Sequence, residues 1–210
     1  KAWAEAGIIA DVTRIVAFMN DTRQWHGWRV DGYPEGEPLP PGLDWDLWHA
    51  SRPPRPYSPM YHPKKWRGWF AYGTGALGDW GAHIIDTAHR FLALGLPTAI
   101  EAVKLDQPSP VVYPQATTLR FEFPARGSMP PVELWWYDGQ ANRPPLPSEL
   151  GPGAVLSELG GKFIFSKTLV FKGGTHGDTL RVIPESRMRE LAAKLPKITG
   201  GFSDHATNFV

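Results

Sequence analysis

The chain contains no cysteine, which excludes disulfide bridges and metal centres held by thiolates. It has no apolar run near the ~20 residues that a membrane-spanning helix needs, and no run of five or more basic residues. The net charge of +1 is too small to indicate nucleic acid or a membrane surface as a partner. With 42% hydrophobic and 20% charged residues, the 210-residue composition is typical of a globular protein with a sizeable core.

Tryptophan, by contrast, is abundant. The chain has ten of them, several times the share expected from average usage. An indole ring offers a flat apolar face with one donor at its edge, which suits a sugar ring. An aromatic-rich core or an oligomer interface uses the same residue, and composition alone leaves these interpretations open.

Hydrophobic periodicity predicts an α+β fold. A helix is expected to end at Gly7, and two more are expected over Ala76–Leu94 and Glu185–Leu195. Strands are expected over Val12–Met19, Ala99–Leu105, Thr117–Phe123, Val132–Tyr137, Lys162–Phe165, Leu169–Phe171 and Thr179–Ile183. Successive strands after one helix indicate a mostly antiparallel open sheet with helices packed on one face. We expect residues 1–210 to form a single domain of a larger protein.

A long proline-rich arm is expected between the first strand and the long helix. Nine prolines lie between residues 31 and 64, and they disfavour both helix and central strand. Trp45, Trp48, Tyr57 and Tyr61 give this segment an apolar surface to bury. The arm is therefore expected to be ordered rather than a flexible linker.

The turn Gly73-x-Gly75-x-x-Gly78 fits the letters of the dinucleotide-binding fingerprint. Its context differs, because the preceding residues 66–72 are aromatic rather than Val/Ile-rich. In addition, Asp106 lies 28 positions after Gly78 (106 − 78), against about 20 expected. We therefore expect these glycines to allow a tight turn that brings Asp79 and His83 to the lip of a pocket.

Asp79, His83 and Asp86 are spaced four and three residues apart, so they share one face of the predicted helix. A histidine flanked by carboxylates can exchange a proton near neutral pH. The same pattern could bind a metal, or Asp79 could stabilise the helix dipole while His83 is a core residue. The further ligands available for a metal are His89, His176, Asp178 and His205. The residues alone leave these three interpretations open.

Four segments, in this order, resemble the substrate domain of the glucose–fructose oxidoreductase, inositol dehydrogenase and MocA (Gfo/Idh/MocA) family. They are Leu43-Asp-Trp-Asp-Leu-Trp48, Arg55-Pro-Tyr57, Trp66-Arg-Gly-Trp69 and Gly73-Thr-Gly-Ala-Leu-Gly-Asp-Trp-Gly-Ala-His83. The likeness is to a bacterial subgroup with a tryptophan-rich arm, and residues 6–12 and 205–209 are similar to it as well. One departure is His49-Ala-Ser51, which stands where that subgroup usually has a Gly-Pro turn.

The resemblance implies an NAD- or NADP-dependent oxidoreductase that acts on a sugar or cyclitol. The nucleotide-binding domain, with the lysine of the family's Glu-Lys-Pro motif, is expected outside this chain. The family's Asp-x-x-x-His pair matches Asp79 and His83, so His83 would be the acid/base and Asp79 would orient the reacting hydroxyl. Asp86, Trp66 and Arg67 would contribute to the substrate site, and no cofactor-binding or metal-binding residue is expected here.

The expected partners are a small sugar, the separate nucleotide-binding domain and a second copy bound through the open sheet face. Two alternatives are a non-catalytic carbohydrate-binding or oligomerisation module and a metal-dependent sugar hydrolase or isomerase. Nothing in the sequence decides between a cytoplasmic and a periplasmic location.

Overall fold

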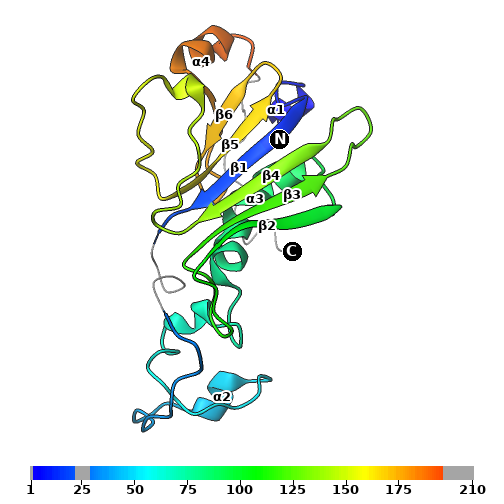
Figure 1. The fold of residues 1–210 in the computed structure, drawn as a ribbon. Coiled ribbons are helices and arrows are strands. Elements are labelled where there is room, and N and C mark those ends of the chain that lie inside the picture. The colour runs from blue at the N-terminus through cyan, green and yellow to red at the C-terminus, as the bar shows by residue number, and fades with distance from the viewer. Residues whose placement is uncertain (1, 22–28, 196–210) are drawn as a thin grey trace.

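The computed structural model describes residues 2–21 and 29–195, and these form a seven-stranded sheet, helices and a long arm (Figure 1). The helices are α1 (Ala2–Glu5), α2 (Trp45–His49), α3 (Gly75–Phe91) and α4 (Glu185–Ala192), with 3-10 turns η1 (Lys65–Gly68) and η2 (Ser148–Leu150). The strands are β1 (Val12–Met19), β2 (Ala99–Asp106), β3 (Ala116–Phe123), β4 (Val132–Asp138), β5 (Gly160–Ser166), β6 (Val170–Gly173) and β7 (Arg181–Ile183). The α+β prediction is confirmed, with element ends shifted by a few residues.

The sheet has the strand order β2-β3-β4-β1-β5-β6-β7. Every neighbouring pair is antiparallel except β1 and β4, which run parallel with Ile15 opposite Leu134. The strands β2 and β7 are the two free edges, so the sheet is open, as the sequence predicts.

Helix α3 packs on one face of the sheet through an apolar stripe. Ile84, Ala88 and Leu92 are spaced four residues apart and are all buried. They meet the inward-facing side chains of the central strands, including Ile15 and Trp136. Burial of this stripe leaves the opposite side of α3, which carries Asp79, His83 and Asp86, facing away from the sheet.

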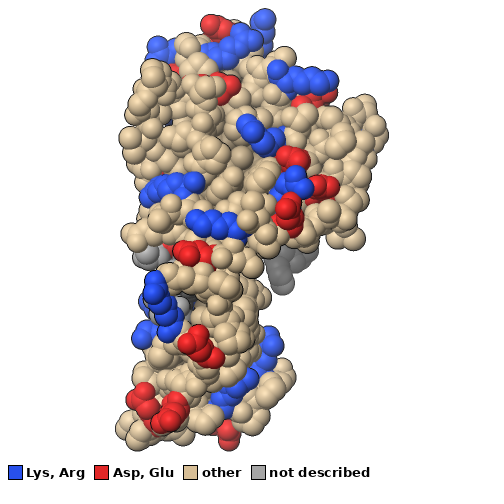
Figure 2. Space-filling model, in the orientation of Figure 1, with Lys and Arg blue, Asp and Glu red and all other residues tan. Residues whose placement is uncertain are grey.

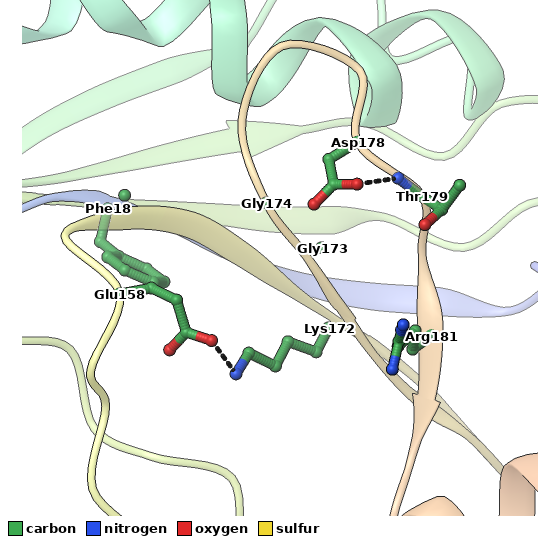
Figure 3. Close-up of a pocket in the computed structure, with 9 residues that line it drawn as sticks. Phe18, Glu158, Lys172, Gly173, Gly174, Asp178, Thr179 and Arg181 are labelled. Atoms are coloured by element: carbon green, nitrogen blue, oxygen red, sulfur yellow. Dashed lines mark hydrogen bonds and ion pairs between the residues drawn. The ribbon is translucent and has the colours of Figure 1, made fainter.

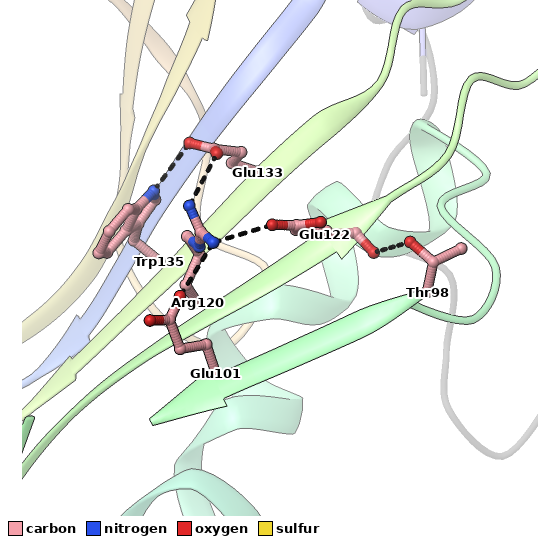
Figure 4. A network of polar contacts seen from close by, with 6 residues as sticks. All are labelled: Thr98, Glu101, Arg120, Glu122, Glu133 and Trp135. Atoms are coloured by element: carbon pink, nitrogen blue, oxygen red, sulfur yellow. Dashed lines mark hydrogen bonds and ion pairs between the residues drawn. The ribbon is translucent and has the colours of Figure 1, made fainter. Parts of the chain in front are cut away.

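The other face of the sheet is divided into two halves. Over β1 and β5, Phe18 and Phe163 are covered by Leu146, Leu150 and Leu156 from the connection between β4 and β5. Over β2, β3 and β4, side chains form the polar network of Figure 4.

At the centre of that network is Arg120. Its guanidinium lies 2.9 Å from Glu101, 2.9 Å from Glu122 and 3.5 Å from Glu133, and Trp135 donates to Glu133. The face shown in Figure 2 carries acidic and basic side chains interspersed. Self-association through this half of the sheet stays a prediction.

The proline-rich arm extends beyond one end of the sheet and carries α2 (Figure 1). Trp45, Tyr57, Tyr61 and Trp69 form its buried centre, so the expected apolar surface is present.

The prolines of the arm disfavour helix over the segment as a whole, but Trp45–His49 form a short helix within it. Residues 42–52 contain no proline, and the Asp44 side chain accepts a hydrogen bond from the Leu47 amide at 2.9 Å, which caps the helix. Ala50 then takes a positive φ of 49°, a conformation that glycine adopts more readily.

Tyr61 gives a stability prediction. Its side chain is fully buried, and its hydroxyl has no hydrogen-bond partner among the described residues. Tyr61→Phe is therefore expected to raise the free energy of unfolding by about 1 kcal/mol at pH 7, because it removes an unpaired buried hydroxyl. Urea unfolding measures the change, and a loss of more than about 1 kcal/mol would contradict it.

The same substitution should change how the free energy of unfolding depends on pH at alkaline pH. Burial, followed by the neighbouring Tyr72, raises the pKa of Tyr61 from 10.0 to about 12. A raised folded-state pKa contributes stability that is complete below pH 10 and is lost as the pH rises toward 12. The Tyr61→Phe variant should therefore lose less stability than the parent chain across this range.

Candidate functional site

The glycine-rich turn before α3 is shaped by close packing. A Cβ on Gly73 would lie 2.4 Å from the Arg67 carbonyl oxygen, and one on Gly75 would lie 2.7 Å from the Tyr113 ring. Gly75 also has a φ of +63°, a conformation that glycine adopts without strain. The tight turn places the start of α3 against η1, so Asp79 meets Arg67.

The same geometry shows whether this turn could bind the pyrophosphate of a dinucleotide. Residues 65–68 form a 3-10 turn rather than a strand, and the space beside Gly73, Gly75 and Gly78 is filled by the chain's own atoms. A pyrophosphate requires a strand, an open backbone cradle and a helix N-terminus. The turn therefore does not fit a nucleotide-binding site.

The predicted stripe exists on the outward face of α3. His83 is exposed, and the carboxylates of Asp79 and Asp86 are 29% and 54% exposed. Asp79 pairs with the Arg67 Nε at 3.3 Å, while Asp86 pairs with Arg90 at 3.6 Å. Each of the two carboxylates therefore lies against an arginine.

Trp66 and Arg67 join this stripe from η1. The Arg67 guanidinium lies over the Trp66 ring, 4.4 Å from its centroid, while its Nε contacts Asp79. The structure therefore brings Trp66, Arg67 and Asp79 together near the N-terminal end of α3. Asp86 lies two helical turns further along and borders a hollow with Ala82 and His89.

His83 has aromatic neighbours. The centroid of its ring lies 5.6 Å from Trp80 and 4.5 Å from His176. His176 comes from the turn between β6 and β7, and its backbone N–H donates to the His83 carbonyl oxygen at 2.8 Å. Figure 3 shows this turn leaving β6 at Gly173 and returning at Thr179. Sequence reasoning considered His176 only as a metal ligand and did not place it beside His83.

Metal binding lacks a ligand set in residues 2–21 and 29–195, where no three His, Cys, Asp or Glu side chains could hold an ion together. His89 lies near the other end of α3, where its Nε2 is 2.9 Å from the Gly95 carbonyl oxygen. His205 lies outside the described residues.

Within residues 2–21 and 29–195, no helix is long and apolar enough to cross a membrane.

A second hollow of about 290 Å³ lies beside the β6–β7 turn (Figure 3). Within it, Lys172 pairs with Glu158 at 2.5 Å, and this hydrogen bond lowers the pKa of the Glu158 carboxyl. The charges of Lys172 and Glu158 therefore neutralise each other, so this pair does not favour the binding of a charged ligand in the hollow.

Sequence reasoning missed Lys162. This side chain is fully buried on the α3 side of β5, and its Nζ donates to the Gly174 carbonyl oxygen at 2.9 Å. Burial lowers the pKa of Lys162, while Asp178 and Asp86 act in the opposite direction. Its position between two glycines and a hydrophobic run gave no sequence signal, because a lysine in a short strand is normally exposed.

Comparison with known proteins identifies the family. Residues 6–115, just over half of the chain, match the Gfo/Idh/MocA model described as the oxidoreductase family, C-terminal alpha/beta domain. The chain belongs to the Gfo/Idh/MocA oxidoreductase family. The match includes β1, the arm and the whole of α3, so it contains Asp79 and His83. A search of curated proteins found no match.

Proposed function

We propose that this chain is the substrate-binding and catalytic domain of a larger Gfo/Idh/MocA oxidoreductase that acts on a sugar or cyclitol. NAD or NADP would bind mainly to a separate nucleotide-binding domain, because the glycine-rich turn of this chain does not fit a pyrophosphate. When bound, the nicotinamide supplies the acceptor or donor of hydride at the reacting carbon.

His83 would move the proton. In the oxidative direction, the proton of the substrate hydroxyl passes to an imidazole nitrogen, and the carbon that bears this hydroxyl gives its hydride to the nicotinamide and becomes a carbonyl. In the reductive direction, the nicotinamide gives hydride to the carbonyl carbon and the imidazolium returns the proton to the carbonyl oxygen. Both directions balance without a metal ion.

The observation that supports this proposal most is the exposure of His83 on the outward stripe of α3. A proton carrier needs an open approach, and a histidine walled into the core could not serve. Asp79 would contribute to hydroxyl binding from the same stripe, with its carboxylate held by Arg67 at 3.3 Å. The Trp66 ring beneath that guanidinium would border the substrate.

Two measurements test the proposal. The full-length enzyme is expected to oxidise or reduce at least one member of a panel of hexoses, pentoses and inositols with NAD(H) or NADP(H), followed by absorbance at the nicotinamide band. The 210-residue chain alone is expected to show no saturable binding of NADH or NADPH at micromolar concentration, followed by nicotinamide fluorescence. Absence of turnover with every pair, or tight coenzyme binding by the chain alone, would contradict the proposal.

A further inference from the structure

We propose that His176 is a second substrate-contacting histidine, and that His83 and His176 together bind two neighbouring hydroxyl groups of a polyol. This inference rests on the proposed function, in which His83 exchanges the proton of the reacting hydroxyl. His176 would hold the adjacent hydroxyl and so select substrates that carry one.

The backbone of the turn that carries His176 is attached at two points, one on α3 and one on β5. The His176 backbone N–H donates to the His83 carbonyl oxygen at 2.8 Å, which links the turn to the backbone of α3. At its other side, the buried Lys162 Nζ donates to the Gly174 carbonyl oxygen at 2.9 Å. Lys162 itself is opposite Gly173 in the β5–β6 pairing. The turn is therefore held against α3 by its backbone, independently of the His176 ring.

The backbone of His176 is strained. Its φ is +53°, and that of the following Gly177 is +74°. A residue with a Cβ loses free energy of folding in this region, whereas glycine does not, and strained residues of this kind cluster at functional sites. A turn that served only to connect two strands would be better made with glycine at position 176. The ring is the part of the residue that glycine lacks, and the ring is what lies against His83.

The chemistry of the exposed rings suits a polyol. The Thr175 hydroxyl and the His176 Nδ1 are hydrogen-bonded at 2.9 Å, so Nε2 is the ring nitrogen left for another partner. His83 and His176 are both exposed, with ring centroids 4.5 Å apart. The Trp80 ring is 5.1 Å from His176 and 5.6 Å from His83, and it adds an apolar surface. Two polar rings beside one indole match a sugar, which has hydroxyls on its rim and C–H groups on its faces.

The test uses the full-length enzyme with the variants His176→Gly and His176→Asn, and with the best substrate of the hexose and inositol panel. Both replacements tolerate a positive φ, so the turn should keep its shape. His176→Gly is expected to raise KM about tenfold with kcat changed less than about threefold, which corresponds to loss of one hydrogen bond to substrate. His176→Asn, which keeps a polar group, is expected to recover part of the loss.

A deoxy analogue identifies the contact. The wild-type enzyme is expected to use the analogue that lacks the hydroxyl next to the reacting carbon about tenfold less well than the parent substrate, as kcat/KM. In His176→Gly this preference should fall to near unity, because the group that reads the hydroxyl is gone. An equal rise in KM for substrate and analogue would overturn the inference.

The remaining outcomes separate this inference from the proposed function. Unchanged KM and preference in His176→Gly, together with loss of turnover in His83→Ala, would overturn the role of His176 and leave the proposed function standing. Full turnover in His83→Ala, or no turnover by the wild type with any panel member, would overturn both. A urea unfolding curve accompanies each variant, and a KM change that comes with loss of stability in His176→Gly would also overturn the contact role.

Discussion

Replacement of His83 by alanine is expected to lower the kcat of the full-length enzyme by about 10²- to 10⁴-fold, the usual contribution of a positioned acid or base. The substitution should leave the free energy of unfolding within about 0.5 kcal/mol, because the side chain is exposed and lies outside the packed stripe of α3. Steady-state kinetics with the best substrate of the panel measures the first effect, and urea unfolding measures the second.

A histidine from the same helix provides the control. His89 is also exposed, but its Nε2 lies at the Gly95 carbonyl oxygen near the C-terminal end of α3. His89→Gln is expected to keep kcat within about twofold, since glutamine can still donate to that carbonyl. Equal loss in both variants would indicate damage to the helix rather than to proton transfer. Full activity of a stable His83→Ala enzyme would remove the basis for the proposed mechanism.

The loss in His83→Ala should also depend on pH in an informative way. If the imidazole moves the proton, the limb of the kcat/KM profile that reports the essential acid or base in the wild type should flatten in the variant. His89→Gln should keep the wild-type profile. A profile unchanged in His83→Ala would assign the titrating group to another residue.

The long helix and its two faces could be predicted because their signal is local. The apolar positions Ile84, Ala88 and Leu92 recur with helical spacing, so their burial requires Asp79 and His83 to point away from the sheet. Along β4, the alternation of Leu134 and Trp136 with Trp135 is likewise a local pattern, and the first two are buried while Trp135 is half-buried. These features depend on a few neighbouring residues. The family resemblance added the roles expected of Asp79 and His83.

The pairing of strands could not be predicted in the same way. β1 pairs in parallel with β4, which lies more than a hundred residues further along the chain. Nothing in the residues of either strand indicates which other strand it pairs with. His176 could not be assigned to the site for this reason, because it approaches His83 only through the β5–β6–β7 order. The same order places Lys162 under the His176 turn, on the side of the sheet where a lysine is least expected.

Replacement of Trp136 by alanine is expected to give the largest loss of stability. The side chain is fully buried between β4 and α3, and its indole N–H donates to the Asp138 carboxylate at 2.8 Å. Truncation of a buried tryptophan typically costs about 3–5 kcal/mol, because transfer and cavity terms add. That is a large share of the roughly 5–15 kcal/mol that stabilises a domain. Urea unfolding of the chain measures it.

The neighbouring tryptophan is a matched control, because Trp135 has the same size and lies in the same strand but on the half-buried face, where it donates to Glu133 at 3.3 Å. Trp135→Ala is expected to cost about 1 kcal/mol, the typical value for a site that is not fully buried. Equal losses would contradict the difference in burial between Trp136, which packs against α3, and Trp135.

Trp136 also belongs to the cluster that includes Trp80 and Ile84, which precede and follow the position of His83 along α3. Trp136→Ala should therefore lower kcat in the folded full-length enzyme without any contact to substrate, since small displacements of a catalytic group reduce its rate contribution.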